Sequence, residues 1–448
     1  MNRIARRSGI AFLLALLLIA GFTFFLVEYF VEADEWVIFP GSPHVYNAGN
    51  IGCGVVTDRE RYLILDLRDG RSYSEDALLR ASTVHWVGDR NGNISAPALS
   101  YHASSMSGFD FLSGVYSYGN AASVAELSLS ARVQRVSLEA MGDYRGTVAV
   151  YNYKTGEIIC AVTTPTYDPD NVPEQKDGMY LNRFTQSVYI PGSIFKIVTL
   201  AAALDSIPDI RQQTFTCTGS YTVGADTITC EGAHWDQDIK SAFSNSCNCA
   251  FAQIALQVGG ERLEQYAQQF GITQSLSFDG ITTAPGNFEA AGAAQVNVAW
   301  SGIGQYHDEI NPCAFLTFIG AIANGGKGAQ PHLVERIKVG SATTYRAKTD
   351  YGSRVLSETT AEILKEYMLY NVSDHYGSEN FLGLTAGAKT GTGEVGGGKK
   401  PNAMLAGFVE DEQYPLAFIV AVEDAGYGGQ VCIPIISKVL EACKDSLK

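Results

Sequence analysis

A serine and a lysine three residues apart are the first side chains that could do chemistry. Ser193 follows Pro191 and Gly192, and Lys196 lies at the start of an apolar run that ends at Leu204. Ser193 suits the N-terminal position of a helix, and side chains three residues apart share a helical face, so the two can touch. Burial lowers the pKa of a lysine, and a hydroxyl beside a lysine that can lose its proton is an activated nucleophile. The N–H groups of the helix N-terminus could stabilise a developing oxyanion.

The serine–lysine pair alone leaves a structural explanation open, in which the serine caps a helix and the lysine reaches to solvent. Two downstream motifs count against it. Ser246-Cys247-Asn248 gives S-x-N, and Lys389-Thr390-Gly391-Thr392 gives K-T-G-T, in that order after Ser193. The S-x-N segment by itself could be a hydrogen-bonded helix cap. The three motifs together favour a catalytic site.

These motifs resemble those of the class B penicillin-binding proteins, the monofunctional peptidoglycan D,D-transpeptidases of division and elongation type. The resemblance covers about residues 127–448 and includes Leu181–Arg183, Ile303–Gln305 and Ala323–Gly326. It implies an α/β (α+β) fold of the penicillin-binding and β-lactamase-like transpeptidase type, with an antiparallel sheet flanked by helices. It also implies a role in peptidoglycan synthesis, and thus in cell division or cell shape.

The resemblance assigns catalytic roles to Ser193, Lys196 and Ser246. Ser193 would attack the penultimate D-alanine carbonyl of a stem peptide, Lys196 would take the hydroxyl proton, and Ser246 would relay a proton to the leaving D-alanine. Substrate binding falls to the other motif residues, Asn248, Lys389, Thr390, Gly391 and Thr392. Lys389 would supply positive potential, and the backbone N–H groups of Ser193 and Thr392 would form the oxyanion hole. A β-lactam would be trapped at the same serine.

Three other functions stay open at this point. A β-lactamase of the same fold needs a base that activates water for deacylation, and the sequence identifies none. A β-lactam sensor is expected to have several membrane spans, and the sequence shows one. A non-catalytic scaffold for cell-wall synthesis is expected to lose Ser193, Lys196 or Lys389, and all three are present. One departure from the family is Gly393 in place of alanine or serine, which we expect to loosen the strand end.

The N-terminal segment has the pattern of a membrane anchor. Three arginines precede residues 9–27, which carry no charge and approach the about 20 residues needed to cross a bilayer. The positive-inside rule then places the N-terminus in the cytoplasm and the catalytic domain outside the cell membrane. A signal peptide cleaved near residues 31–33 is the alternative, but the apolar run is longer than usual for one. The predicted organisation is a cytoplasmic tail (1–8), a transmembrane anchor (9–30), a linker and pedestal module (31–126) and a transpeptidase domain (127–448).

Hydrophobic periodicity predicts the elements that must position the motifs. A hairpin at the start of the catalytic domain and three strands near its end are expected to form one antiparallel sheet. The predicted hairpin is Gly146–Val162, and the predicted strands are Thr385–Thr392, Met404–Val409 and Leu416–Val422. Helices are predicted over Ser130–Met141, Ile239–Leu256, Ala314–Ala323, 358–371 and Val431–Lys448. The S-x-N segment is expected to interrupt the second of these helices, at a junction over Ser244–Asn248.

The composition of the chain limits the kinds of partner and ligand that it is expected to bind. A net charge of -15 over 448 residues argues against nucleic acid, which requires a basic surface. Nine cysteines are an odd number, so at least one is unpaired within the chain. Cys217 and Cys230 could form a disulfide or remain two free thiols. No C-x-x-C and no clustered histidine spacing occurs, so we expect no metal ligand and no cofactor. The expected partners are stem peptides, β-lactams and, by resemblance, a membrane-embedded glycan polymerase with division or elongation proteins.

Overall fold

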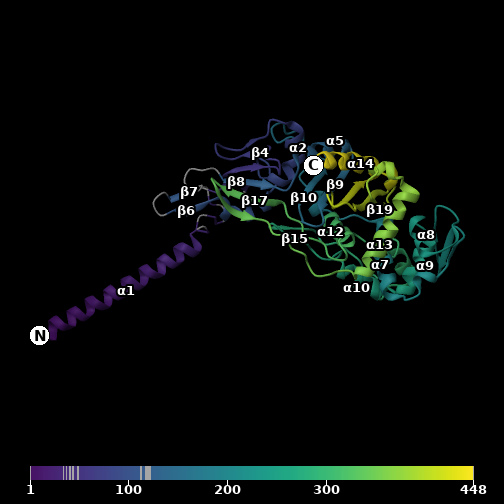
Figure 1. The fold of residues 1–448 in the computed structure, drawn as a ribbon, viewed down its shortest axis with the longest axis horizontal. Helices are drawn as coiled ribbons and strands as arrows, with labels where there is room; N and C mark the ends of the chain where they lie inside the picture. The colour runs from purple at the N-terminus through teal and green to yellow at the C-terminus, as the bar shows by residue number, and fades with distance from the viewer. Residues whose placement is uncertain are drawn as a thin grey trace.

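The structure is a computed structural model that describes residues 2–446 except 34, 37, 40, 41, 43, 44, 48, 49, 111–113 and 117–122. The predicted linker falls partly, and residues 447 and 448 wholly, outside the described residues. The rest of the chain forms an elongated body with one helix projecting from it (Figure 1).

A five-stranded sheet forms the centre of the catalytic half, in the order β10-β9-β21-β20-β19. All neighbouring pairs are antiparallel. The strands are β9 (Arg145–Asn152), β10 (Ile158–Thr164), β19 (Ala386–Gly393), β20 (Asn402–Val409) and β21 (Leu416–Glu423). The N-terminal hairpin thus pairs with the three C-terminal strands, as predicted, and β19 with its K-T-G-T motif lies at one edge of this sheet.

Strand β21 shows why this sheet is buried on both faces. Its residues alternate between two cores, with Phe418 and Val420 in one and Ala417 and Ile419 in the other. Side chains of a strand point alternately to the two faces of a sheet, so a strand covered on both sides is apolar throughout. The continuous apolar run in the sequence therefore reflects two helical layers.

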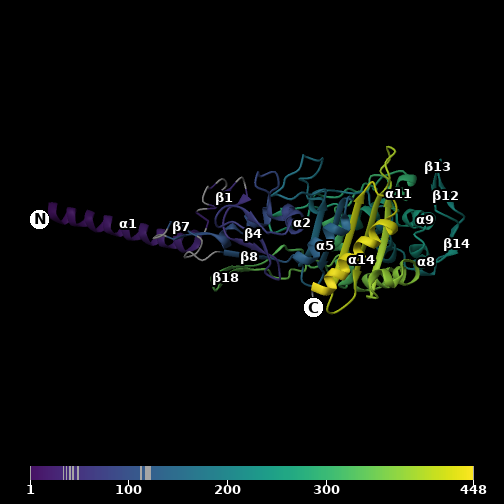
Figure 2. The same cartoon turned by 90° about the horizontal axis from the view of Figure 1, so that it is seen from above.

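Helices cover both faces of the sheet. α5 (Ala131–Met141) and α14 (Gly428–Ser446) pack together on one face (Figure 2). The other face carries α12 (Pro312–Ala323), with α13 (Glu358–Asn371) and α7 (Lys196–Ser206) in the same layer. Ser130 caps the start of α5, since its Oγ accepts a hydrogen bond from the Val133 N–H.

A second, six-stranded sheet lies between the catalytic sheet and the projecting helix (Figure 1). Its order is β18-β17-β8-β3-β4-β5. The strands are β3 (Val55–Thr57), β4 (Leu63–Asp66), β5 (Ser72–Tyr73), β8 (Ser123–Leu127), β17 (Val334–Val339) and β18 (Ala342–Arg346). Two of these strands come from far along the chain, and Arg336 of β17 forms a partly buried ion pair with Glu126 of β8. The predicted domain boundary between residues 126 and 127 stays a prediction, because β17 and β18 follow it in the chain and still belong to this sheet.

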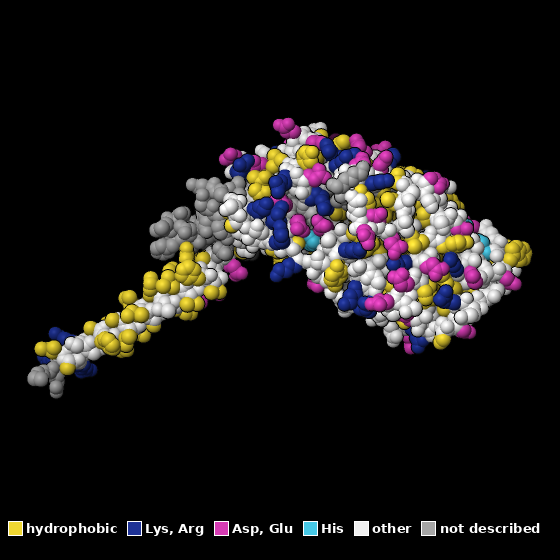
Figure 3. All heavy atoms as spheres, in the orientation of Figure 1, with side chains coloured by type: hydrophobic (Ala, Val, Ile, Leu, Met, Phe, Trp, Pro, Cys, Tyr) yellow, Lys and Arg dark blue, Asp and Glu magenta, His cyan; other side chains and the backbone are white. Residues whose placement is uncertain are grey.

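The projecting helix is α1 (Asn2–Glu32). It is long and apolar enough to cross a membrane, and its apolar stretch has no contact with the body that would bury it. Figure 3 shows apolar side chains along its length and basic side chains at its free end. The helix fits a single-pass membrane anchor.

Deletion of residues 1–32 should leave the rest of the protein folded. The reason is that the apolar stretch of α1 is not buried against either sheet. We expect an unchanged thermal unfolding midpoint by circular dichroism and loss of binding to lipid vesicles. Unfolding of the truncated protein would contradict this description of α1.

Candidate active site

Ser193 lies in a short 3-10 turn, η1 (Gly192–Phe195), that leads directly into α7. The predicted helix therefore begins with a tighter turn than expected. The Ser193 side chain does not cap this helix; its Oγ lies 2.9 Å from Lys196 Nζ. The predicted contact between the two side chains is present.

Lys196 is fully buried and surrounded by oxygen atoms. Its Nζ lies 2.5 Å from the Ser246 carbonyl oxygen and 2.7 Å from Asn248 Oδ1, to both of which it donates. A neutral amine has two N–H groups and one lone pair. With both N–H groups engaged by these two acceptors, the lone pair can face the Ser193 hydroxyl. The geometry therefore suits proton transfer from Ser193 to Lys196.

The pKa of Lys196 is lowered from 10.5 to about 7, first by burial and then by the nearby Lys389 cation. Burial also lowers the pKa of Lys389 to about 7, and the opposing attraction of Glu231 acts on both lysines. Near neutral pH a large share of each amine is uncharged. A partly neutral Lys196 agrees with its predicted role as the base. A partly neutral Lys389 differs from the prediction that this residue supplies only positive charge.

The S-x-N segment lies at the junction of α8 (Ile239–Ser244) and α9 (Asn248–Val258), as expected from the sequence, and its Asn248 is the first residue of α9. Ser246 has a φ of 51°, in the left-handed region that non-glycine residues rarely adopt and that costs about 1–2 kcal/mol. This backbone places Ser246 Oγ 2.9 Å from Lys389 Nζ and 3.3 Å from Lys196 Nζ. Ser246 therefore bridges the two buried amines.

Strand β19 approaches the Ser193 turn backbone to backbone. A Cβ on Gly391 would lie 2.5 Å from the Pro191 carbonyl oxygen, and one on Gly192 would lie 2.2 Å from the Thr392 carbonyl oxygen. Gly192 also has a φ of +53°. The glycine of K-T-G-T is thus required for the close approach of the two segments.

The expectation that Gly393 loosens the end of β19 stays a prediction. Gly393 is the last residue of β19 and pairs with Asn402 of β20. A Cβ at this position would lie 2.1 Å from the Ile190 carbonyl oxygen. Glycine here permits the same close approach as at Gly391.

Two residues at the site were missed as functional candidates. The Thr390 N–H donates to the Tyr376 hydroxyl over 3.2 Å, and the Tyr376 hydroxyl lies 3.1 Å from Thr390 Oγ1. Gln305 Nε2 donates to the Thr392 carbonyl oxygen over 3.3 Å. Gln305 lies in the Ile303–Gln305 segment that resembles the family, so a sequence signal for it existed. Tyr376 is the last residue of a π-helical turn that carries no sequence motif.

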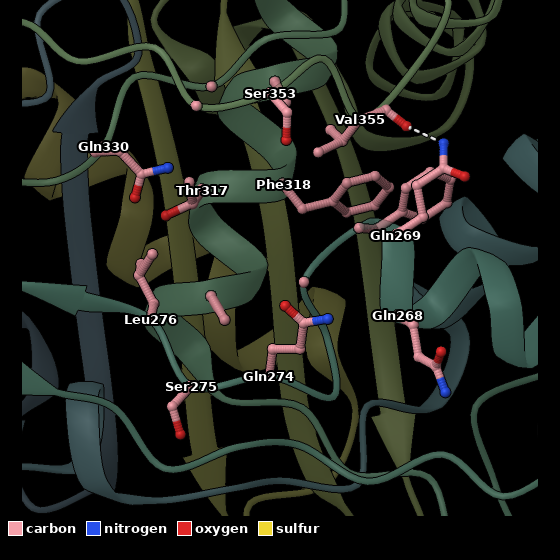
Figure 4. Close-up of a pocket in the computed structure, with 16 residues that line it drawn as sticks. Gln268, Gln269, Gln274, Ser275, Leu276, Thr317, Phe318, Gln330, Ser353 and Val355 are labelled. Atoms are coloured by element: carbon pink, nitrogen blue, oxygen red, sulfur yellow. Dashed lines mark hydrogen bonds between the residues drawn. The ribbon is translucent and has the colours of Figure 1, made fainter.

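A hollow of about 200 Å³ lies elsewhere, between α10 (Gly260–Gln269) and α12 (Figure 4). Its rim is closed by a bond from Gln269 Nε2 to the Val355 carbonyl oxygen over 2.7 Å. None of the eight predicted site residues lines this hollow. The buried amines and Ser193 are therefore the stronger candidate for chemistry.

Lys196→Met should stabilise the protein, most strongly at acidic pH. The lysine pKa is 10.5 unfolded and about 7 folded, so the unfolded chain binds more protons between these values and the parent becomes more stable as pH rises through that window. The substitution also leaves the Ser246 carbonyl oxygen and Asn248 Oδ1 without this donor, which lowers the gain. We therefore expect the free energy of unfolding to rise by about 2 kcal/mol below pH 7, and this increase to shrink toward pH 10.5. Denaturant unfolding at several pH values measures it, with Lys348→Met, at an exposed lysine, as the control. A loss of stability at every pH would contradict the cost assigned to this buried amine.

Comparison with known proteins agrees with this geometry. The family model described as "Penicillin binding protein transpeptidase domain" matches residues 146–441. The peptidoglycan D,D-transpeptidase PbpA of Mycolicibacterium smegmatis is 29% identical over 354 residues, covering 69% of this chain and 70% of that protein. The stage V sporulation protein D of Bacillus subtilis is 28% identical over 72% of this chain, which spans 53% of that protein.

A solved structure shares the fold. The crystal structure of PBPA from Mycobacterium tuberculosis superposes with a TM-score of 0.76 at 22% identity, over 88% of this chain and 99% of that one. The match to the family model spans most of the chain and includes all three motifs. The chain therefore belongs to the penicillin-binding protein transpeptidase family, as a class B member.

Proposed function

We propose that this protein is a serine-type peptidoglycan D,D-transpeptidase with Ser193 as its nucleophile. The observation that carries the proposal is the contact of 2.9 Å between Ser193 Oγ and the fully buried Nζ of Lys196. Lys196 has a pKa of about 7 and two N–H groups already bonded to oxygen, so it can accept the hydroxyl proton. The transpeptidase names of the relatives support the reaction class.

Acylation of the serine follows from this arrangement. As Ser193 Oγ bonds to the penultimate D-alanine carbonyl carbon, its proton moves to Lys196 Nζ. Ser246 Oγ lies within hydrogen-bond distance of both amines and can pass a proton to the leaving D-alanine nitrogen. The N–H groups of Ser193 and Thr392 are the proposed oxyanion hole. Attack on the ester by an amine of a second stem peptide then restores Ser193 and completes the crosslink.

The edge position of β19 suits an extended peptide. β19 pairs with β20 on one side, so its other side can pair with a substrate strand. Thr390 and Thr392 alternate with Lys389 and Gly391 along it, which gives Thr390 and Thr392 one face of the strand. We assign these threonines to the terminal carboxylate, Asn248 to the peptide amide and Lys389 to the electrostatic support of Ser246.

A long-lived acyl-enzyme is favoured over β-lactam hydrolysis. In the described part of the chain, the hydrogen-bond partners of Ser193, Lys196, Ser246 and Lys389 are amines, hydroxyls, an amide and carbonyl oxygens. A carboxylate that could activate water for deacylation is not among them. M. tuberculosis PBPA, of the same fold, is described as acyl-enzyme complexes with penicillin G and imipenem.

We further propose the cellular arrangement predicted from the sequence. α1 anchors the protein in the cell membrane through residues 9–30, with residues 1–8 in the cytoplasm. Residues 31–126 form the linker and pedestal, and residues 127–448 act on peptidoglycan outside the membrane. The basic free end and the acidic residues that follow the apolar stretch support this orientation. Its proposed partners are a membrane-embedded glycan polymerase and proteins of division or elongation.

Penicillin should acylate Ser193 and remain attached for hours. Intact-mass analysis should show one adduct, and peptide mapping should place it on Ser193. Ser193→Ala should remove the adduct, whereas Ser220→Ala, on an exposed strand, should retain it. Release of hydrolysed drug within minutes would support the β-lactamase alternative, and an adduct on another residue would contradict the assignment of the nucleophile.

Gly391→Ala should slow acylation by about a hundredfold. The added methyl group would contact the Pro191 carbonyl oxygen and displace β19 from the Ser193 turn, and small displacements at an active site can lower rates by this factor. Gly429→Ala is the control, since a Cβ there meets its nearest neighbour at 3.9 Å. Acylation rates of folded variants, measured with a fluorescent penicillin, separate the two. An unchanged rate for Gly391→Ala would contradict the required close approach.

A further inference from the structure

Three cysteines and one histidine meet at the S-x-N segment, which contributes one of the cysteines. They are Cys217, Cys230, His234 and Cys247, and their ligand atoms all lie within 4.8 Å of one another. The Sγ atoms of Cys217 and Cys230 are each 3.6 Å from His234 Nδ1. The Sγ atoms of Cys230 and Cys247 are 3.9 Å apart.

The separations of 3.6 and 3.9 Å are close to those between ligands around a tetrahedral metal ion. Zn–S bonds of about 2.3 Å and Zn–N bonds of about 2.0–2.1 Å place neighbouring sulfur atoms about 3.8 Å apart and sulfur and nitrogen about 3.5 Å apart. A disulfide needs about 2.05 Å between its sulfur atoms, much less than the 3.9 Å between Cys230 and Cys247. Three thiolates and one imidazole at distances that suit tetrahedral coordination favour zinc over other metal ions.

We propose that Cys217, Cys230, His234 and Cys247 bind one Zn²⁺ ion. Four protein ligands leave no open coordination position, so the site is structural and not catalytic. The proposal replaces the expectation, from the sequence, that the chain has no metal ligand.

The four ligands come from two small β-ribbons and the start of α9. Cys217 ends β11 (Phe215–Cys217) and His234 precedes β14 (Trp235–Gln237), its antiparallel partner. Cys230 follows β13 (Asp226–Thr229), which pairs with β12 (Ser220–Val223) in a separate two-stranded ribbon. Two-stranded ribbons are marginal on their own, and a metal ion is a common way to stabilise so small a unit.

Cys247 connects this unit to the active site. It is the N-cap of α9 and lies between Ser246 and Asn248. The Asn248 N–H donates to Cys230 Sγ over 3.2 Å, and the Ala250 N–H donates to Cys247 Sγ over 3.4 Å. Such N–H···S bonds stabilise thiolate ligands and orient them. The ion would therefore act as a positioning device for Ser246 and Asn248, without contact with substrate.

The test uses the full chain, purified in detergent, with metal content measured by inductively coupled plasma mass spectrometry. We expect one zinc ion per chain in the parent and in Cys313→Ser, which removes a buried thiol of α12 outside the cluster. Cys217→Ser should lose most of the zinc. Because that variant could fail to fold, the parent is also stripped with a chelator and refilled with Co²⁺ alone, which should give the visible absorption of tetrahedral thiolate–cobalt coordination.

Zinc removal should slow penicillin acylation of Ser193 by at least about tenfold, and Zn²⁺ alone should restore it. A parent without bound metal, a parent mass two daltons low because two of these cysteines form a disulfide, or full zinc retention by Cys217→Ser would each overturn the site. Unchanged acylation after zinc removal would overturn the positioning role, which rests on the proposed function. Bound zinc in a protein that penicillin never acylates would leave the metal site intact and count against the transpeptidase proposal.

Discussion

Two buried amines are the constraint on which the rest of the site depends. Lys196 and Lys389 are both fully buried, and burial holds each pKa at about 7 instead of 10.5. At neutral pH a shift of this size costs on the order of 5 kcal/mol for each lysine, which is comparable to the whole stability of a typical domain. Apolar packing in the two cores on the central sheet must offset that cost. As a result, the folded protein holds an amine that can act as a base.

The site is built by contact between three separate segments. The Ser193 turn, the S-x-N junction and the edge strand β19 each carry part of it, and each is held by backbone features as well as side chains. Glycines allow β19 to reach the turn, and a left-handed backbone at Ser246 turns its hydroxyl between the two amines. The proposed zinc ion would add a further link, because Cys247 belongs both to the metal cluster and to the S-x-N segment.

Periodicity in the sequence predicted much of the fold. The central strands are apolar throughout because helices cover both faces, and α13 begins and ends where the pattern of residues 358–371 indicates. The three motifs identified the residues that converge on Lys196, since each is short and local. The resemblance to the family supplied the order of the reaction.

Features that depend on tertiary contact could not be predicted from the same patterns. β17 and β18 join the N-terminal sheet although they lie more than two hundred residues beyond β8, and no local signal encodes that partner. Tyr376 reaches Thr390 from a π-helical turn. The cysteine cluster was not predicted as a metal site, because its ligands are spread over two β-ribbons and a helix cap. The usual C-x-x-C spacing is therefore missing from the sequence.

The titration of Lys196 in the folded protein tests the central claim most directly. Lysine labelled with ¹³C at Cε reports the protonation of each amine by NMR, and the Lys196 resonance can be assigned by its absence from Lys196→Met. The account predicts a titration midpoint near pH 7, far below the usual value of 10.5. A Lys196 amine that stays protonated up to about pH 10 would contradict it, because Ser193 would then have no base beside it at neutral pH.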